Sequence, residues 1–212
     1  PDDYMFEYAV PILNKLHAGN KPFFAAFMTA SDHGPYYIPP YFKPKNSAIK
    51  NQIVEYADYS LRKFMDLSSQ QEWFKNTLFV FVADHGAALD GLYDMSLTYN
   101  HAPLLFYAPE ILKEHKTLPD MAGQIDIFPS IMGLLKMSYD NNTLGVDLFK
   151  ESRPYIFFNA DDKYGVIDHD WFLIARNDNS KSLYKYQNKD THNYATERPE
   201  ILELMDRYAK SN

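Results

Sequence analysis

The chain has 212 residues, a formal net charge of −7 and no cysteine. That length is sufficient for one domain with a sizeable core. The charge argues against nucleic acid or an anionic membrane surface as the main partner, because phosphate groups attract an excess of Lys and Arg. The lack of cysteine excludes disulfides, Cys-based zinc sites and a Cys nucleophile within this chain. The chain opens on Pro-Asp-Asp-Tyr without a Met, so we expect it to be a piece of a longer protein.

The first third of the chain predicts a helix, a strand and a loop in that order. Apolar residues at three- and four-residue spacing predict an amphipathic helix over residues 2–16, with a kink at Pro11. Residues 22–30, PFFAAFMTA, form a continuous apolar run of strand length. The four prolines of residues 31–45 predict a loop, since proline is excluded from central strands and helix interiors.

A second amphipathic helix is predicted after this loop, capped by Asn46 or Ser47 and carrying an apolar stripe over residues 49–65. Residues 78–84, LFVFVAD, then predict another strand. The remaining predicted elements are a strand at 103–109, a helix beginning near Phe128, a strand at 153–160, two or three strands between 164 and 187, and a closing helix at 199–209.

Apolar strands that alternate with amphipathic helices predict an α/β fold with a mostly parallel sheet flanked by helices. The C-terminal pattern adds a small antiparallel sheet and a terminal helix. In parallel sheets, ligands collect at the carboxyl ends of the strands. His33 follows the strand at 22–30, and Asp84 and His85 follow the strand at 78–83, so we expect them to open onto the same edge.

Asp84 and His85 support two interpretations. A carboxylate and a neutral imidazole suit a divalent ion such as Zn²⁺ or Mn²⁺, and Gly86 allows the chain to turn so that both could face one ion. Alternatively, Asp84 caps the following turn and His85 has no role. Taken alone, the triplet Asp-His-Gly is short and common, which favours the second interpretation.

The other candidate histidines also have structural alternatives. His33 could stack on Tyr36 or Pro35 within its loop, and His101 could be a structural residue ahead of the strand at 103–109. The sequence contains neither a Gly-rich phosphate loop nor a G-x-S-x-G nucleophile elbow.

Five segments, read in order, carry a resemblance to a known family. They are FFAAFMTASDHGPYYIP, LFVFVADHG, YNHAPLLFYAPEIL, GQIDIFPSIMGLL and SLYKYQNKD. In this order they resemble the C-terminal half of the alkaline phosphatase-like superfamily, in particular its sulfatase / lipoteichoic acid synthase-like phosphoglycerol transferase branch. The resemblance covers nearly the whole chain. It implies that residues 1–150 form the C-terminal part of the α/β core, and that residues 151–212 hold the last core strand, the small antiparallel subdomain and the C-terminal helix.

The resemblance assigns roles to four residues. Asp84 and His85 match the family's metal ligands, which implies a Mn²⁺ or Zn²⁺ cofactor. His33 matches a loop histidine that binds the substrate phosphate or a second metal, and His101 matches a further active-site histidine, so both are expected to be catalytic.

Other matched positions are structural, or depart from the family's pattern. Gln124 and Asp126 fall in a segment that is a structural hallmark more than a catalytic one. Lys185 replaces the usual Asp, and Thr191 replaces the usual Pro, in the late strand and turn.

The implied activity is that of a metal-dependent phosphoglycerol transferase or sulfatase-like enzyme, acting on phosphate or sulfate esters of phospholipids or glycans through a Thr or Ser nucleophile. In the family, that nucleophile and an early acidic metal ligand lie in the N-terminal half, and neither is matched here. The missing N-terminal half of the same domain is therefore the expected partner. The chain alone is expected to bind metal weakly and to turn over nothing.

The resemblance further implies an upstream membrane segment and an extracytoplasmic location, periplasmic or at the cell surface. A sugar sulfatase or phosphatase is one alternative function. A degenerate, non-catalytic binding module with the same fold is another. His101 favours the transferase branch, because typical sulfatases carry a Lys at that position.

Overall fold

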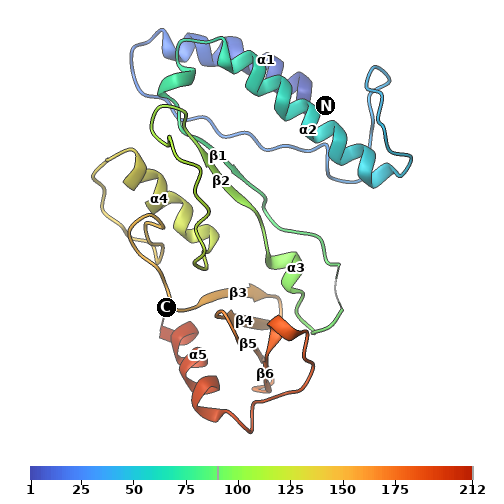
Figure 1. The fold of residues 1–212 in the computed structure, drawn as a ribbon, viewed down its shortest axis with the longest axis vertical. Coiled ribbons are helices and arrows are strands. Elements are labelled where there is room, and N and C mark those ends of the chain that lie inside the picture. The colour runs from blue at the N-terminus through green and yellow to red at the C-terminus, as the bar shows by residue number, and fades with distance from the viewer. Residues whose placement is uncertain (90, 212) are drawn as a thin grey trace. The chain divides into compact units, whose positions relative to one another are not determined.

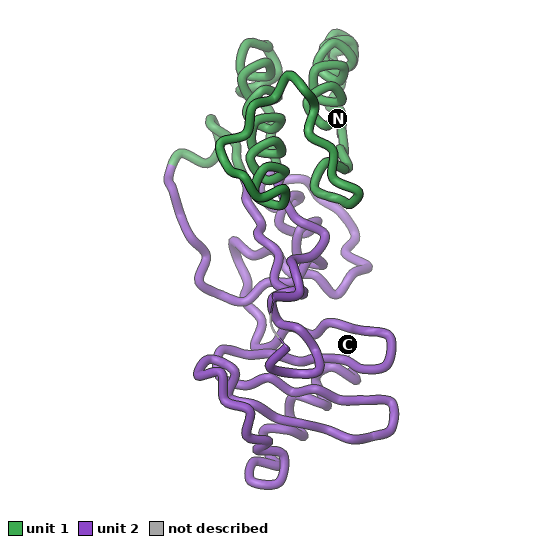
Figure 2. The backbone as a smooth tube through the Cα atoms, turned by 90° about the vertical axis from the view of Figure 1, so that its right-hand side faces the viewer, with its two compact units in different colours: residues 1–79, 107–113 green, residues 80–106, 114–212 purple. Residues whose placement is uncertain are grey.

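In the computed structural model, which describes residues 1–89 and 91–211, the chain begins with two helices, continues through strands and short helices, and ends in four consecutive strands and a helix (Figure 1). The chain divides into unit 1, residues 1–79 and 107–113, and unit 2, residues 80–106 and 114–212 (Figure 2). No helix in the described part of the chain is both long and apolar enough to span a membrane.

Unit 1 is built on two helices that lie side by side, α1 (Asp2–His17) and α2 (Ile49–Ser69) (Figures 1 and 2). Both helices were expected from their apolar spacing, and both are confirmed. Phe6 of α1 stacks on Phe64 of α2 with ring centroids 4.8 Å apart. The other buried apolar residues of the pair are Ala9, Val10, Leu13, Ile53 and Tyr56.

Two details of unit 1 differ from the predictions. Residues 22–30 belong to neither of the two sheets among the described residues, so the predicted strand is wrong there. A strand is defined by its hydrogen-bonded neighbour, which composition cannot supply. Phe24 and Met28 in this segment are 86% and 91% exposed.

The predicted cap of α2 is also wrong. The N-cap is Ala48, and no side chain caps the helix. Asn46 instead contacts Glu55 of the helix. The Glu55 carboxylate accepts hydrogen bonds from the backbone N–H of Asn46 at 3.1 Å and from that of Lys45 at 2.6 Å. The acceptor that holds this turn therefore comes from within the helix.

In the middle of the chain, β1 (Phe79–Val82) and β2 (Leu104–Tyr107) form a two-stranded sheet, which confirms both predicted strands. The short helix α3 (Leu97–Asn100) precedes β2, and its N-cap Ser96 accepts a hydrogen bond from the Tyr99 N–H at 3.1 Å. The other short elements are η1 (Phe74–Asn76), η2 (Gln124–Asp126), α4 (Ile127–Leu134) and η3 (Tyr186–Asn188).

The C-terminal part confirms the predicted antiparallel sheet and terminal helix (Figure 1). Four antiparallel strands follow the chain order: β3 (Ile156–Ala160), β4 (Lys163–Ile167), β5 (Phe172–Arg176) and β6 (Lys181–Tyr184), and α5 (Pro199–Ser211) closes the chain. Leu173 packs in one buried cluster with Met205 of α5, while Phe172 and Ile174 pack in another with Met95. Because successive strand residues face opposite sides, β5 is buried on both faces and is apolar from Phe172 to Ala175.

Candidate functional site

The turn after β1 carries Asp84 and His85 and lies against the segment that ends in His101. The Gly86 N–H donates a hydrogen bond to the Tyr99 carbonyl at 2.8 Å. A Cβ atom at Gly86 would lie 2.1 Å from the Thr98 carbonyl oxygen and 2.9 Å from that of His101. Gly86 has no positive φ, so this position requires glycine for space. The absence of a side chain is what allows the two segments to approach each other.

The ring of His85 is held in one orientation. Its Nδ1 lies 2.8 Å from the carbonyl oxygen of Gly86, and the ring stacks on Tyr99 with centroids 4.4 Å apart. A carbonyl only accepts hydrogen bonds, so Nδ1 carries the proton and Nε2 keeps its lone pair. Such a bond from the second ring nitrogen is the usual support for a histidine that binds a metal.

Asp84 divides its two oxygens between the backbone and the imidazole. Oδ1 accepts a hydrogen bond from the His85 N–H at 2.8 Å, and Oδ2 lies 3.8 Å from His85 Nε2. The carboxylate therefore caps its turn, as one interpretation of the sequence proposed, and still presents one oxygen beside a lone-pair nitrogen. The Asp84 side chain is 89% exposed and that of His85 is 49% exposed, so both are open to an ion.

These two donors fit one edge of a metal site. Ligand atoms at about 2.1 Å from a single ion lie roughly 3–4 Å from one another, and Oδ2 of Asp84 and Nε2 of His85 are 3.8 Å apart. Among residues 1–89 and 91–211 there is no group of three or more His, Asp or Glu side chains placed to hold an ion. The described residues thus offer two ligands, where a structural zinc site uses four and a catalytic one three.

Gln124 holds the backbone that carries Asp84. Its side-chain amide donates to the carbonyl oxygens of Ala83 at 2.8 Å and of Asp84 at 2.9 Å. Asp126, two residues later, is fully buried and accepts hydrogen bonds from the N–H groups of Gly123 and Val146 at 2.8 and 2.9 Å. These contacts give a physical reason for the structural role expected of this segment.

His33 lies in unit 1, in a second copy of the triplet Asp-His-Gly. Its Nδ1 is 2.8 Å from the carbonyl oxygen of Gly34, so its Nε2 is likewise free to accept a hydrogen bond. The buried Asp2 at the start of α1 holds the loop, because its carboxylate accepts from the N–H groups of Ala30 and Ser31 at 3.0 and 3.1 Å.

The four predicted site residues are thus distributed over both units. Asp84, His85 and His101 belong to unit 2, and the side chain of His101 is exposed at the end of α3. That all four surround one cleft stays a prediction. No pattern in the sequence pointed to Tyr99, whose ring contact with His85 depends on the turn at Gly86.

The Sulfatase family model matches residues 1–137. A lipoteichoic acid synthase-like protein of Bacillus subtilis (strain 168), YvgJ, is 24% identical over 159 residues, which cover 61% of this chain and 25% of that protein.

Two solved structures share the fold. A protein of the alkaline phosphatase superfamily from Vibrio parahaemolyticus matches with a TM-score of 0.79 and 24% identity, covering 90% of this chain and 48% of the other. A Bacteroides thetaiotaomicron protein described in connection with the metabolism of multiple glycosaminoglycans matches with a TM-score of 0.76 and 20% identity, covering 100% of this chain and 55% of the other. The chain therefore spans about half the length of these structures.

Proposed function

Because this chain belongs to the Sulfatase family, we propose that it is part of the catalytic domain of a metal-dependent enzyme that transfers phosphoglycerol groups. The observation that carries the proposal is the pair formed by Asp84 Oδ2 and His85 Nε2, 3.8 Å apart and open to solvent. The likeness to a lipoteichoic acid synthase-like protein favours phosphoglycerol transfer within the family.

In this proposal Asp84 and His85 hold Mn²⁺ or Zn²⁺, which would lower the pKa of a hydroxyl nucleophile and offset charge on the ester oxygens. His85 binds through Nε2, because Nδ1 donates to the Gly86 carbonyl. His33 and His101 contact the transferred group or protonate the leaving oxygen. Because Nδ1 of His33 donates to the Gly34 carbonyl, Nε2 is the ring nitrogen left for this role, and it donates there when the ring is protonated.

We further propose that the Thr or Ser nucleophile and the remaining metal ligands come from the N-terminal half of the same domain. Two observations support this partner. The described residues supply only two clustered donors, and the apolar segment 22–30 has no strand beside it, with Phe24 and Met28 almost fully exposed. A phospholipid or glycan ester is the proposed substrate. The complete protein is proposed to act on the extracytoplasmic face of a membrane, anchored by an upstream segment.

A sugar sulfatase or phosphatase is the second candidate. The matched family model and the likeness to a protein connected with glycosaminoglycan metabolism favour it. A non-catalytic binding module is the third, and the presence of His33, Asp84, His85 and His101 together counts against it.

Titration of the purified chain with Mn²⁺ and Zn²⁺, followed by calorimetry, tests the proposal. We expect weak binding at one site, with Asp84→Ala abolishing it, because one of only two clustered donors is lost. Asp161→Ala, which removes another exposed carboxylate, is the matched control and should bind as the parent chain does. If the Asp84→Ala chain binds the metal as tightly as the parent chain, Asp84 is not a metal ligand.

Activity of the complete protein separates the candidate functions. Release of diacylglycerol from phosphatidylglycerol, with the glycerol phosphate group transferred to an acceptor hydroxyl, supports the transferase, whereas cleavage of a sugar sulfate supports the sulfatase. Metal binding without either activity supports the binding module.

A further inference from the structure

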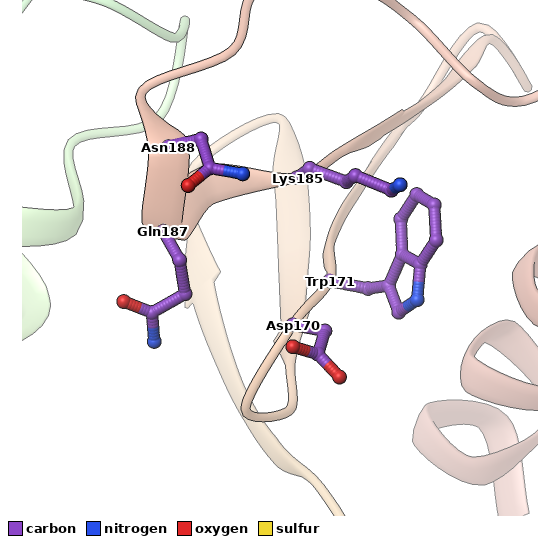
Figure 3. A pocket seen from close by; sticks show the side chains of 5 residues that line it. All are labelled: Asp170, Trp171, Lys185, Gln187 and Asn188. Atoms are coloured by element: carbon purple, nitrogen blue, oxygen red, sulfur yellow. The ribbon is translucent and has the colours of Figure 1, made fainter.

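A small cavity lies at one end of the C-terminal sheet, within unit 2 and formed by residues that have no part in the proposed metal site. It has a volume of about 320 Å³ and is lined by Asp170, Trp171, Lys185, Gln187 and Asn188 (Figure 3). That volume is at the lower end of the range for ligand pockets, so it suits one sugar ring rather than a lipid chain.

The cavity is formed by two turns that are fastened to each other. One turn is fixed by Asp168, whose Oδ1 accepts hydrogen bonds from the N–H groups of Asp170 and Trp171 at 2.8 and 2.6 Å. The other turn contains η3, and two hydrogen bonds connect it to the first. The Tyr186 hydroxyl donates to the Asp168 carbonyl at 2.8 Å, and the Gln187 amide donates to the His169 carbonyl at 3.0 Å. The lining is therefore ordered before any ligand binds, which reduces the entropic cost of binding.

Lys185 places a positive charge at this cavity. Its Nζ lies 5.3 Å from the ring centroid of Trp171 and 5.4 Å from that of Tyr194. Two aromatic faces hold the ammonium group by cation–π attraction and leave its N–H donors available for an anion. The family's pattern has an Asp at this position, so the charge is a property of this chain rather than one inherited from the resemblance.

The other lining groups suit hydroxyls. The Asn188 amide can donate and accept hydrogen bonds, and the carboxylate of Asp170 accepts them. Gln187 offers its amide oxygen as an acceptor, because its N–H groups donate to the His169 carbonyl and the Tyr186 hydroxyl. In Figure 3, Lys185 lies above the indole of Trp171 and Asp170 lies below it. The carboxylate would repel an anion, so the anionic group belongs at Lys185 and sugar hydroxyls belong near Asp170.

We propose that this cavity is a binding subsite for a single sugar unit that carries a phosphate or sulfate group. The ammonium of Lys185 contacts the anionic group, and Asp170, Gln187 and Asn188 bind the hydroxyls. Trp171 is only 9% exposed and serves to position the ammonium. The subsite stands independently of the catalytic proposal, because none of its residues contacts Asp84 or His85 among the bonds described above.

Nuclear magnetic resonance tests the proposal directly, since the chain has two tryptophans and hence two indole N–H signals. Trp73 is buried in unit 1 and serves as the internal reference. Glucose 6-phosphate and galactose 6-sulfate should shift the Trp171 signal to saturation and leave that of Trp73 in place. Glucose and inorganic phosphate should each bind at least about tenfold more weakly than the anionic sugars, because each makes only half of the contacts.

Lys185→Met should reduce the affinity for both anionic sugars about tenfold, the loss expected for one charge-assisted hydrogen bond. Lys189→Met, in the same turn but outside the lining, is the matched control and should bind as the parent chain does. Asn188→Ala provides a second variant should Lys185→Met disturb the fold, and it should weaken binding of glucose 6-phosphate because it removes an exposed amide from the lining. The proposal is overturned if neither anionic sugar gives a saturable shift, if Lys185→Met binds as tightly as the parent, or if inorganic phosphate binds as tightly as glucose 6-phosphate.

Discussion

Asp94 and Arg176, 82 residues apart in the chain, form an ion pair with two hydrogen bonds. Arg176 Nε donates to Asp94 Oδ2 at 2.7 Å and its Nη2 donates to Oδ1 at 2.8 Å. The hydrogen bond from Arg176 holds the pKa of Asp94 below its usual value. Asp94 lies in the loop between His85 and His101, and Arg176 ends β5. The C-terminal sheet therefore anchors the loop that links two predicted site residues.

We predict that Asp94→Asn loosens this loop. The side chain of Asp94 is 42% exposed, so the cost should be about 1 kcal/mol in the free energy of unfolding of unit 2. Urea denaturation followed by the fluorescence of Trp171 would measure this loss of stability. Hydrogen exchange of the Gly86 amide should also become faster than in the parent chain. Asp161→Asn, an exposed carboxylate elsewhere in unit 2, should leave both values unchanged. Unaltered exchange at Gly86 in Asp94→Asn would contradict the anchoring role.

Gly86→Ala should disrupt the turn that carries His85. The added methyl group would meet the Thr98 carbonyl oxygen at 2.1 Å, and both partners are backbone, so the segments must separate. Overpacking of this kind costs about 1–3 kcal/mol, and metal affinity should fall with it. Gly91→Ala is the matched control in the same loop, because no atom lies within 4 Å of its Cβ position. Denaturation curves and metal titration of the two variants check the prediction, and equal behaviour would refute it.

Gln124→Ala should weaken metal binding without unfolding the protein. The variant removes the donors to the Ala83 and Asp84 carbonyls and so frees the backbone of a proposed ligand. Loss of such a supporting contact typically lowers metal affinity about 10- to 100-fold. The control is Gln52→Ala, because the Gln52 amide makes the same kind of double contact, to the carbonyls of Asn46 and Ser47 in unit 1. A similar change of affinity in both variants would show that the effect is not local.

Asp206 should make the C-terminal part sensitive to acid. Burial raises its pKa, but hydrogen bonds from Lys181, Lys210 and Tyr164 outweigh this effect and lower the pKa to about 2. Because the pKa is depressed in the folded state, the stabilisation is present above the unfolded value of about 3.9 and is lost as the pH falls towards 2. The loss should be on the order of 2 kcal/mol.

Denaturation at pH 7 and at intermediate pH values down to 2 measures this dependence. Asp206→Asn should be less stable at pH 7 and should lack most of the decline between pH 4 and pH 2. A parent chain whose stability is flat over that range would exclude the assigned role of Asp206.

Much of the fold follows from the sequence because it depends on local periodicity. Apolar residues at three- and four-residue spacing predict α1 without reference to anything distant, but the face that is buried, with Phe6, Ala9, Val10 and Leu13, depends on the packing against α2. The predicted strand at 22–30 failed because a strand requires a neighbour. The predicted cap at Asn46 failed because the N–H groups of Asn46 donate to the carboxylate of Glu55, nine residues away, and its side chain caps nothing.

Only part of the candidate site could be predicted from local sequence patterns. Asp84 and His85 could be identified because they follow an apolar strand directly. Tyr99 and the pair of Asp94 with Arg176 could not, since their contacts depend on how the loop folds back and on a partner 82 residues away.

The exposed segment 22–30 also determines how the isolated chain will behave in the laboratory. It contains no charged residue and leaves Phe24 and Met28 open to solvent, with its backbone outside both described sheets. Uncharged apolar runs of this length are typical nuclei of β-aggregation. Overexpression of these 212 residues alone should therefore send a large fraction into inclusion bodies, and co-expression with the N-terminal half proposed above should raise the soluble fraction.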